Sequence, residues 1–396
     1  MRTPHSVVAR FTAVVGLLLV SVSAVAGSAS AQPRGAATHR LSARHLTPRF
    51  ATRPFAGYNA ARIRQQIAAG TALKTWSSTV HAGDGNTYPF TLVGKNPKKA
   101  QTTPSLSVKT PVVPIILNFN SGPTFDPTVA NTGCETASAL TRTNKSPIFA
   151  SVDYTPGGTD VGTTQYIDAF QRANLYRYTK PTGVNPGYHV LLKKVAMTAI
   201  NVSVPSADST TFGSGCTLLG AIDIDWWDSY LQTTVFPQVA AAGYGPNTFP
   251  IFLFHNVVLY IGNPNNCCVL GYHSAFTFGG GSQTYAIADY DNSTEFGPGV
   301  KDVSALAHEV GEWMDDPYVN NVTPSWGHTG QVSGCQNNLE VGDPLTGTNL
   351  TVAVNGFTYH PQELVFNDWF FENASTAVNH WFSFNDSFTS TSTFCS

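Results

Sequence analysis

The stretch that most constrains this chain is residues 303–316, which contains the pattern His308-Glu309-x-x-Glu312. On an α-helix, residues four apart lie on one face, so His308 and Glu312 point the same way and Glu309 lies beside them. Apolar residues recur at helical spacing on the opposite side. They are Val303, Leu306, Ala307, Val310 and Met314. The pattern predicts a helix with one face for the core and one face for chemistry.

An amphipathic helix with a hydrated polar face is the ordinary interpretation of such a pattern. This chain, however, has only seven Glu among its 396 residues, and two of them lie in this turn beside a His. That scarcity favours a functional cluster. Asp315 and Asp316 follow at the C-terminal end of the helix, where the helix dipole disfavours an anion by about 0.3–1 kcal/mol. A cation or hydrogen-bond donor is therefore expected beside them.

The first 31 residues have the features of a secretory signal. Arg2 and Arg10 form a basic start, residues 11–25 form an apolar core, and Ala29-Ser30-Ala31 is a small-residue cleavage site. The apolar core is too short to span a membrane, and no later stretch offers ~18 uninterrupted apolar residues. The sequence predicts a secreted, extracellular protein without a membrane anchor.

Charge divides the rest of the chain into two parts. Residues 32–110 carry twelve basic residues and one acid, whereas residues 111–396 carry eight basic and 23 acidic residues, a formal charge of −15. A basic arm could bind nucleic acid or a cell surface. In a secreted protein, a pro-segment that lies on an acidic domain is the better interpretation. We therefore predict a signal peptide (1–31), a basic pro-segment (32–110) and an acidic domain (111–396).

Six cysteines in an exported chain predict up to three disulfides. Their pairing does not follow from the sequence, because six cysteines allow fifteen pairings. Adjacent Cys267 and Cys268 are expected to bond to two different partners, since a bond between neighbours requires unfavourable geometry. Cys395, next to the last residue, is expected to tie down the C-terminal tail.

Several segments of the acidic part have clear local patterns. We expect strands at 112–119, 249–260 and 283–290, and a strand or hairpin at 188–204. Helices are expected at 162–178 and 223–242, and a long loop at 317–336. One domain of α/β (α+β) class accounts for this order, with a mixed sheet and a central HExxE helix.

Residues that could complete a metal site lie outside the helix. Glu340, 28 residues after Glu312, is our choice for the third ligand, and Asp343 and His328 are the alternatives. His255 is expected to be a core or sheet-face histidine. His273, beside the cysteine pair, is a weaker site candidate.

Zinc that catalyses hydrolysis takes three protein ligands and keeps a fourth position for water. His308, Glu312 and Glu340 would be the ligands, and Glu309 the general base. Glu312 stands where the common HExxH pattern has a second His, which makes the metal a weaker Lewis acid. Mn²⁺ and Ca²⁺, which favour oxygen ligands, are therefore alternatives to Zn²⁺.

The run HEVGEWMDDPYVNN, followed by NNLEVGDP, resembles the HExxE, Asn/Asp-Pro and Glu-x-x-Asp arrangement of the Exordium-like (phosphate-induced) secreted proteins and their bacterial relatives. The segment CCVLGYHSAF resembles the Cys and His turn that precedes the helix in that family. The resemblance covers residues 249–344. It implies a zincin-like fold and a secreted HExxE protein, and it supports proteolysis less directly.

The leading hypothesis is a secreted zinc-dependent hydrolase, most simply a metallopeptidase, acting as a monomer on a polypeptide or cell-wall substrate. The alternative is a non-catalytic extracellular protein in which the same cluster holds a structural ion or binds a wall polymer. The chain has no P-loop, no dinucleotide-binding glycine pattern and no GxSxG elbow, and we expect neither a nucleic-acid partner nor a membrane partner.

Overall fold

The computed structural model describes residues 46–100 and 106–396. The predicted signal peptide and residues 32–45 of the predicted basic segment lie outside the described residues. Within the described ranges, no helix combines the length and the apolar character needed to cross a membrane.

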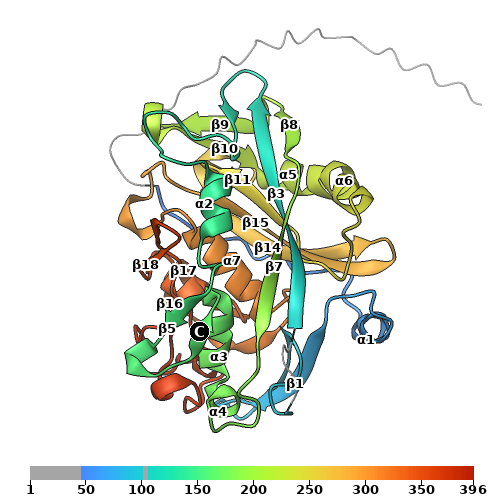
Figure 1. Cartoon of the computed structure of the whole chain (residues 1–396), viewed down its shortest axis with the longest axis vertical. Coiled ribbons are helices and arrows are strands. Elements are labelled where there is room, and N and C mark those ends of the chain that lie inside the picture. The colour runs from blue at the N-terminus through green and yellow to red at the C-terminus, as the bar shows by residue number, and fades with distance from the viewer. Residues whose placement is uncertain (1–45, 101–105) are drawn as a thin grey trace, which may run out of the picture. The chain divides into compact units, whose positions relative to one another are not determined.

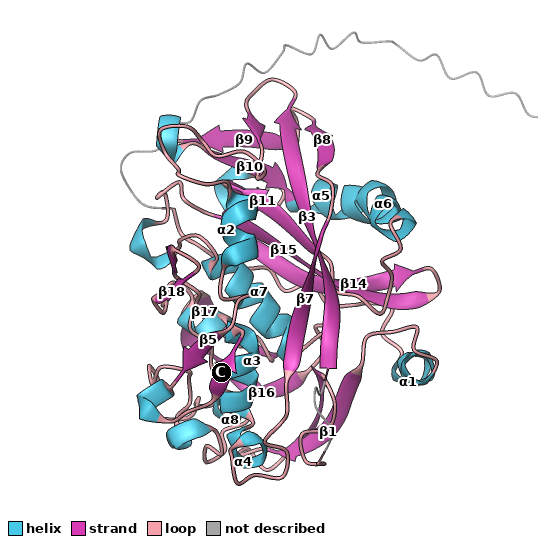
Figure 2. Ribbon diagram, in the orientation of Figure 1, coloured by secondary structure: helices cyan, strands magenta, loops and turns pink. Residues whose placement is uncertain are grey.

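A seven-stranded sheet organises the fold (Figures 1 and 2). Its path is β14-β15-β11-β3-β4, and β7 and β8 pair with successive parts of β3. The sheet is parallel except for β14 and β4, which run antiparallel to their neighbours. The strands are β3 (Leu106–Phe119), β4 (Thr124–Phe125), β7 (Val190–Ala196), β8 (Ile200–Val204), β11 (Ile251–His255), β14 (Gly271–Phe278) and β15 (Gly281–Tyr290).

Helices cover both faces of this sheet, because successive residues of its strands point to opposite sides. Ile251 and Leu253 of β11 pack into one apolar core with helices α3 and α7. Phe252 and Phe254 pack into a second core with α5 and α6. The helices are α3 (Tyr166–Asn174), α5 (Ile224–Tyr230), α6 (Phe236–Ala241) and α7 (Ser304–Asp315). The predicted mixture of helices and strands is confirmed.

The HExxE helix exists as predicted, as α7, but both of its faces are buried. It packs against β14 and β15 on one side and α3 on another. A Cβ atom on Gly311 would lie 2.4 Å from Leu364 Cδ1, so the chain around Leu364 also approaches the helix closely. The expected chemical face is therefore not open to solvent. It faces other buried polar groups.

The two acids at the end of α7 have donors beside them, as expected. Asp315 accepts hydrogen bonds from the side-chain amides of Gln171, Asn174 and Asn367. Asp316 accepts from the backbone N–H groups of residues 320 and 321. Amide groups offset the unfavourable position of these carboxylates.

The apolar run at 249–260 forms two strands instead of one, because Asn256 adopts a left-handed conformation with φ 51°. β11 ends before this residue and joins the large sheet, whereas the following strand joins a four-stranded sheet. That second sheet has the order β13 (Cys267–Val269), β12 (Val257–Tyr260), β10 (Leu219–Asp223) and β9 (Ser209–Phe212).

Three other local predictions need correction. The helix expected at 162–178 begins at Tyr166, because residues 162–164 pair as a strand. Residues 188–204 form two strands that both pair with β3, so the hairpin alternative was wrong. The loop expected at 317–336 is instead a hairpin. Its strands are polar and contain Pro324, so they lack the alternation of apolar residues that would have predicted them.

The remaining elements are short and connect or flank these layers. The strands form four pairs: β1 (Thr75–His81) with β2 (Thr87–Val93), β5 (Val152–Tyr154) with β6 (Gly162–Thr164), β16 (Val322–Thr329) with β17 (Val332–Asn338), and β18 (Val352–Val354) with β19 (Phe357–Tyr359). The helices are α1 (Ala60–Ala68), α2 (Ala139–Lys145), α4 (Tyr176–Thr179) and α8 (Asn367–Phe370).

All six cysteines form disulfides. Cys335 bonds to Cys395, which confirms that the C-terminal tail is tied down. Cys134 bonds to Cys216. The expectation for the adjacent pair was wrong: Cys267 and Cys268 bond to each other across a cis peptide bond, which places their Cα atoms 3.1 Å apart.

The described part of the basic segment belongs to the same compact unit as the acidic part. The predicted boundary at residue 110 falls inside β3, which begins at Leu106 and lies within the main sheet. Hydrogen bonds also join the two parts directly, since Thr91 N–H donates to the Asn321 side chain at 2.9 Å. Whether any of this segment is removed stays a prediction.

Candidate metal centre

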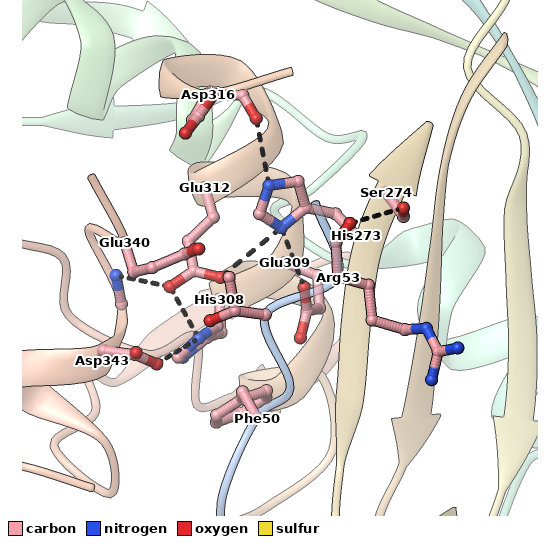
Figure 3. A network of polar contacts seen from close by, with 12 residues as sticks. Phe50, Arg53, His273, Ser274, His308, Glu309, Glu312, Asp316, Glu340 and Asp343 are labelled. Carbon is pink, nitrogen blue, oxygen red and sulfur yellow. Dashed lines mark hydrogen bonds and ion pairs between the residues drawn. The ribbon is translucent and has the colours of Figure 1, made fainter. Parts of the chain in front are cut away.

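Three elements bring a cluster of titratable side chains together in the interior (Figure 3). Helix α7 contributes His308, Glu309 and Glu312, and strand β14 contributes His273. The chain that follows β17 contributes Asp343. The side chains of the two histidines and of Glu309 and Glu312 are each less than 5% exposed.

One set of possible ligands is formed by His308, Glu312 and Asp343. His308 Nε2 lies 2.9 Å from Glu312 Oε1 and 3.4 Å from Asp343 Oδ1. Zinc bonds of 2.0–2.2 Å in a tetrahedral site place ligand atoms roughly 3.3–3.6 Å apart. The three side chains therefore need only small adjustments to surround one ion.

A second set shares Glu312 and consists of His273, Glu309 and Glu312. His273 Nδ1 lies 3.3 Å from Glu309 Oε2 and 3.6 Å from Glu312 Oε2. Nε2 of the same ring donates to the backbone carbonyl of Asp316 at 3.1 Å, because a carbonyl can only accept. This bond fixes the ring so that Nδ1 points at the two carboxylates.

The other imidazole is held differently. Gln362 Nε2 lies 2.7 Å from the carbonyl oxygen of Gly342 and 2.9 Å from His308 Nδ1. Since the carbonyl only accepts, the amide nitrogen faces it, and Nδ1 accepts as well. A ligand at Nε2 requires the opposite tautomer, with Nδ1–H donating to the amide oxygen. Metal binding at His308 therefore requires the Gln362 amide to turn over.

Burial and the two rings set the protonation of the acids. Burial, reinforced by the charge of Glu312, raises the pKa of Glu309 to about 7, although His273 opposes the rise. Burial alone would raise the pKa of Glu312 too, but the charges of His308 and His273 lower it to about 2. Burial raises the pKa of Asp343 and of Glu340. The cluster thus holds more acidic than basic groups, an excess that a bound cation would offset.

Two glycines allow this close packing. A Cβ atom on Gly342 would lie 2.4 Å from His308 Nδ1, and one on Gly271 would lie 3.0 Å from Glu309 Cγ. A larger residue at either position would displace the catalytic candidates.

Two polar atoms of the cluster are buried without a hydrogen-bond partner among the described residues. They are His308 Nε2 and Glu309 Oε1. His308 Nε2 forms ion-pair contacts with Glu312 Oε1 and Asp343 Oδ1. A metal ion at this position would be held by this nitrogen and the two carboxylate oxygens beside it. The residues present therefore fit a divalent cation.

Only some of the predicted site residues lie in the cluster. His308, Glu309 and Glu312 lie together, and His273, the weaker candidate, joins them. Asp343, named as an alternative, takes the place expected for Glu340. Glu340 is buried nearby, where it accepts from Asn338 at 2.9 Å, and it belongs to neither set of possible ligands.

The two other histidines lie away from the cluster. His328 is exposed on β16, and its ring lies 3.9 Å from the sulfur of Cys335, which is already in a disulfide. His255 ends β11, is 6% exposed and contacts Glu135 Oε1 at 3.1 Å. The expectation of a sheet-face histidine there is confirmed. Gln362 was not predicted as a site residue, since nothing in its local sequence links it to α7.

Comparison of the chain with protein-family models, with curated proteins and with solved structures found no match.

Proposed function

We propose that this protein is a secreted metal-dependent hydrolase with a zincin-like arrangement of site residues, and that peptide bonds are its substrate. The observation that carries the proposal is the convergence of the buried His308 Nε2 with the carboxylates of Glu312 and Asp343, close enough to hold one ion. One nitrogen and two carboxylate ligands suit zinc, while Mn²⁺ and Ca²⁺ are the alternatives because oxygen ligands predominate.

The residues around this position have distinct roles. A bound zinc ion supplies a Lewis acid that polarises a carbonyl and lowers the pKa of water. Glu309 would take the proton from the attacking water, and its burial, which raises its pKa, strengthens it as a base. His273 positions Glu309, because its ring is fixed by the Asp316 carbonyl and faces the carboxylate.

A non-catalytic protein with a structural ion or a wall-polymer site is the second candidate. The observation in its favour is the closure of the cluster: Phe50 stacks on the His308 ring, and both faces of α7 are covered. A hydrolase needs an open coordination position, whereas a structural site is closed by protein atoms. The hydrolase proposal therefore requires that Phe50 can be displaced.

Other parts of the proposal rest on sequence. The signal-like N-terminus supports export, and the three disulfides fit an oxidising compartment. The resemblance to Exordium-like proteins supports a cell-wall or extracellular setting. We propose a monomer with a polypeptide or cell-wall substrate and no nucleic-acid partner.

Substitution of Glu309 by Gln tests the catalytic role. Hydrolysis of labelled casein is measured from acid to neutral pH, before and after limited proteolysis that releases the N-terminal segment. The Glu309→Gln variant should keep its zinc and its fold. Its rate of hydrolysis should fall by ~10²- to 10⁴-fold, as expected for loss of a general base. Glu295→Gln, a control outside the cluster, should keep the rate. Full activity of Glu309→Gln, or no hydrolysis by any form, would favour the second candidate.

A further inference from the structure

Residues 46–55 run in an extended conformation beside the candidate metal centre. They form backbone hydrogen bonds with residues 268–271. Arg49 forms a parallel bridge with Val269: Arg49 N–H donates to the Cys268 carbonyl at 3.0 Å, and Leu270 N–H donates to the Arg49 carbonyl at 2.8 Å. Farther along, Ala51 N–H donates to the Gly271 carbonyl at 3.3 Å. This segment therefore lies alongside the chain that leads into β14 and is joined to it by backbone hydrogen bonds.

The side chain of Phe50 covers the imidazole of His308 (Figure 3). The two ring centroids are 3.4 Å apart and the planes differ by 14°. Gln331 forms two hydrogen bonds with the backbone of the same residue. Its side-chain oxygen accepts from Phe50 N–H, and its side-chain nitrogen donates to the Phe50 carbonyl. Gln331 also donates to Asp343, a possible metal ligand. The segment thus contacts the site through both a side chain and its backbone.

The C-terminal part of the segment is held by polar contacts. Ser274 Oγ of β14 donates to the Arg53 carbonyl at 2.7 Å. The Arg53 guanidinium lies 3.1 Å from Asp225 and 3.4 Å from Asp228, both on α5. Asp225 is largely exposed, so this anchor is screened by salt and is the weaker end of the attachment.

We propose that the channel filled by residues 46–55 is the polypeptide-binding site of this protein, and that the segment is its built-in inhibitor. Removal of the segment leaves backbone groups of Cys268, Leu270 and Gly271, and the side-chain oxygen of Gln331, without the partners that it supplies. An extended peptide can satisfy all of them, whereas a sugar polymer cannot reproduce a strand's spacing. The inference rests on the proposed function, because it assigns a substrate class to that site.

The position of Phe50 also defines a preference. Backbone pairing is compatible with many peptide sequences. The space above the His308 ring therefore determines which side chain of the peptide is preferred. A flat aromatic side chain fills that space in the present structure. Peptides with Phe or a similar aromatic residue at this position should bind best.

The test uses a fluorescent peptide with the sequence of residues 46–56. It is titrated into the unaltered full chain and into the Phe50→Ala, Arg53→Ala double variant, whose own segment is weakened at both ends. The double variant should bind the peptide at least about tenfold more tightly, because in the unaltered chain the tethered segment competes at high effective concentration. A peptide that carries Ala in place of Phe50 should bind at least about tenfold more weakly.

The control is Phe119→Ala, which removes a similarly buried Phe from outside the segment. Phe119 packs on Phe125 and not on residues 46–55, so this variant should bind the peptide as the unaltered chain does. Arg53→Ala alone serves if circular dichroism shows the double variant to be unfolded, since Arg53 is partly exposed. It should bind the peptide more tightly than the unaltered chain, though less tightly than the double variant.

Binding can be measured without hydrolysis, so the titrations are repeated in the Glu309→Gln background. Tight binding there, without any hydrolysis by the parent protein, would retain the channel and reject the proposed function. Absence of saturable binding by any folded variant, or equal binding to the Phe119→Ala and Phe50→Ala, Arg53→Ala forms, would overturn the channel.

Discussion

Asp289 and Asp291 form a buried carboxyl pair at the end of β15, and the pair makes the stability of the fold depend on pH. Replacement of Asp291 by Asn should remove most of this dependence. Asp289 Oδ1 accepts from Val257 N–H at 3.0 Å, and Asp291 Oδ2 accepts from the Ser293 hydroxyl at 2.9 Å. Their other oxygens have no further partner among the described residues. Burial and the charge of Asp291 oppose ionisation of Asp289, so one of the two carboxyls keeps a proton.

The direction of the effect follows from the raised pKa values. Burial raises the pKa of Asp291 to about 6 from 3.8, and burial with the charge of Asp291 raises the pKa of Asp289. The folded state holds a proton that the unfolded chain releases near the usual pKa, so the free energy of unfolding falls as the pH rises. The stabilisation is complete below about pH 4 and lost above about pH 6. A shift from 3.8 to about 6 corresponds to about 3 kcal/mol.

In the Asp291→Asn variant, an amide N–H can donate to Asp289 Oδ2 at every pH, so the pair no longer needs a proton. Urea unfolding followed by tryptophan fluorescence at acid and neutral pH measures the effect. The loss of unfolding free energy between the two pH values should be about 3 kcal/mol smaller in the variant. Asp386→Asn, an exposed control, should show the full loss. An equal loss in Asp291→Asn would refute the shared proton.

Two further predictions concern the support of the site and of the tail. Gln362→Leu should weaken zinc binding by about 10- to 100-fold, because His308 Nδ1 loses the group that can orient it; equilibrium dialysis measures this, and unchanged affinity would place the metal elsewhere. Cys395→Ser opens a disulfide that spans 60 residues and should lower the free energy of unfolding by up to about 4 kcal/mol; a thermal melt that matches the unaltered protein would contradict it.

Helix α7 and the buried strands could be predicted because their signals are local. The apolar spacing of residues 303–314 and the unbroken apolar run of 112–119 suffice to define a helix and a strand. The β16–β17 hairpin could not be predicted, because its strands are polar and its position depends on the distant Cys335–Cys395 bond. Local patterns do not contain such long-range constraints.

The candidate site was predictable only in part, for the same reason. His308, Glu309 and Glu312 are close in sequence and share a helix, so their proximity follows from helical geometry. The choice between Glu340 and Asp343 depends on how the chain turns after β17, which spacing does not determine. The position of Phe50 over His308 depends on packing between segments far apart in the sequence.

The central claim is that a metal ion binds at His308 with Glu312 and Asp343. Its most direct test is the zinc content, by equilibrium dialysis and elemental analysis, of the unaltered protein and of three variants, His308→Ala, Asp343→Asn and His273→Ala. The account predicts a single zinc ion in the unaltered protein and in His273→Ala, and its loss in the other two. Retention of zinc by His308→Ala together with its loss in His273→Ala would place the ion in the second set of ligands. Absence of zinc from every form would contradict the metal centre itself.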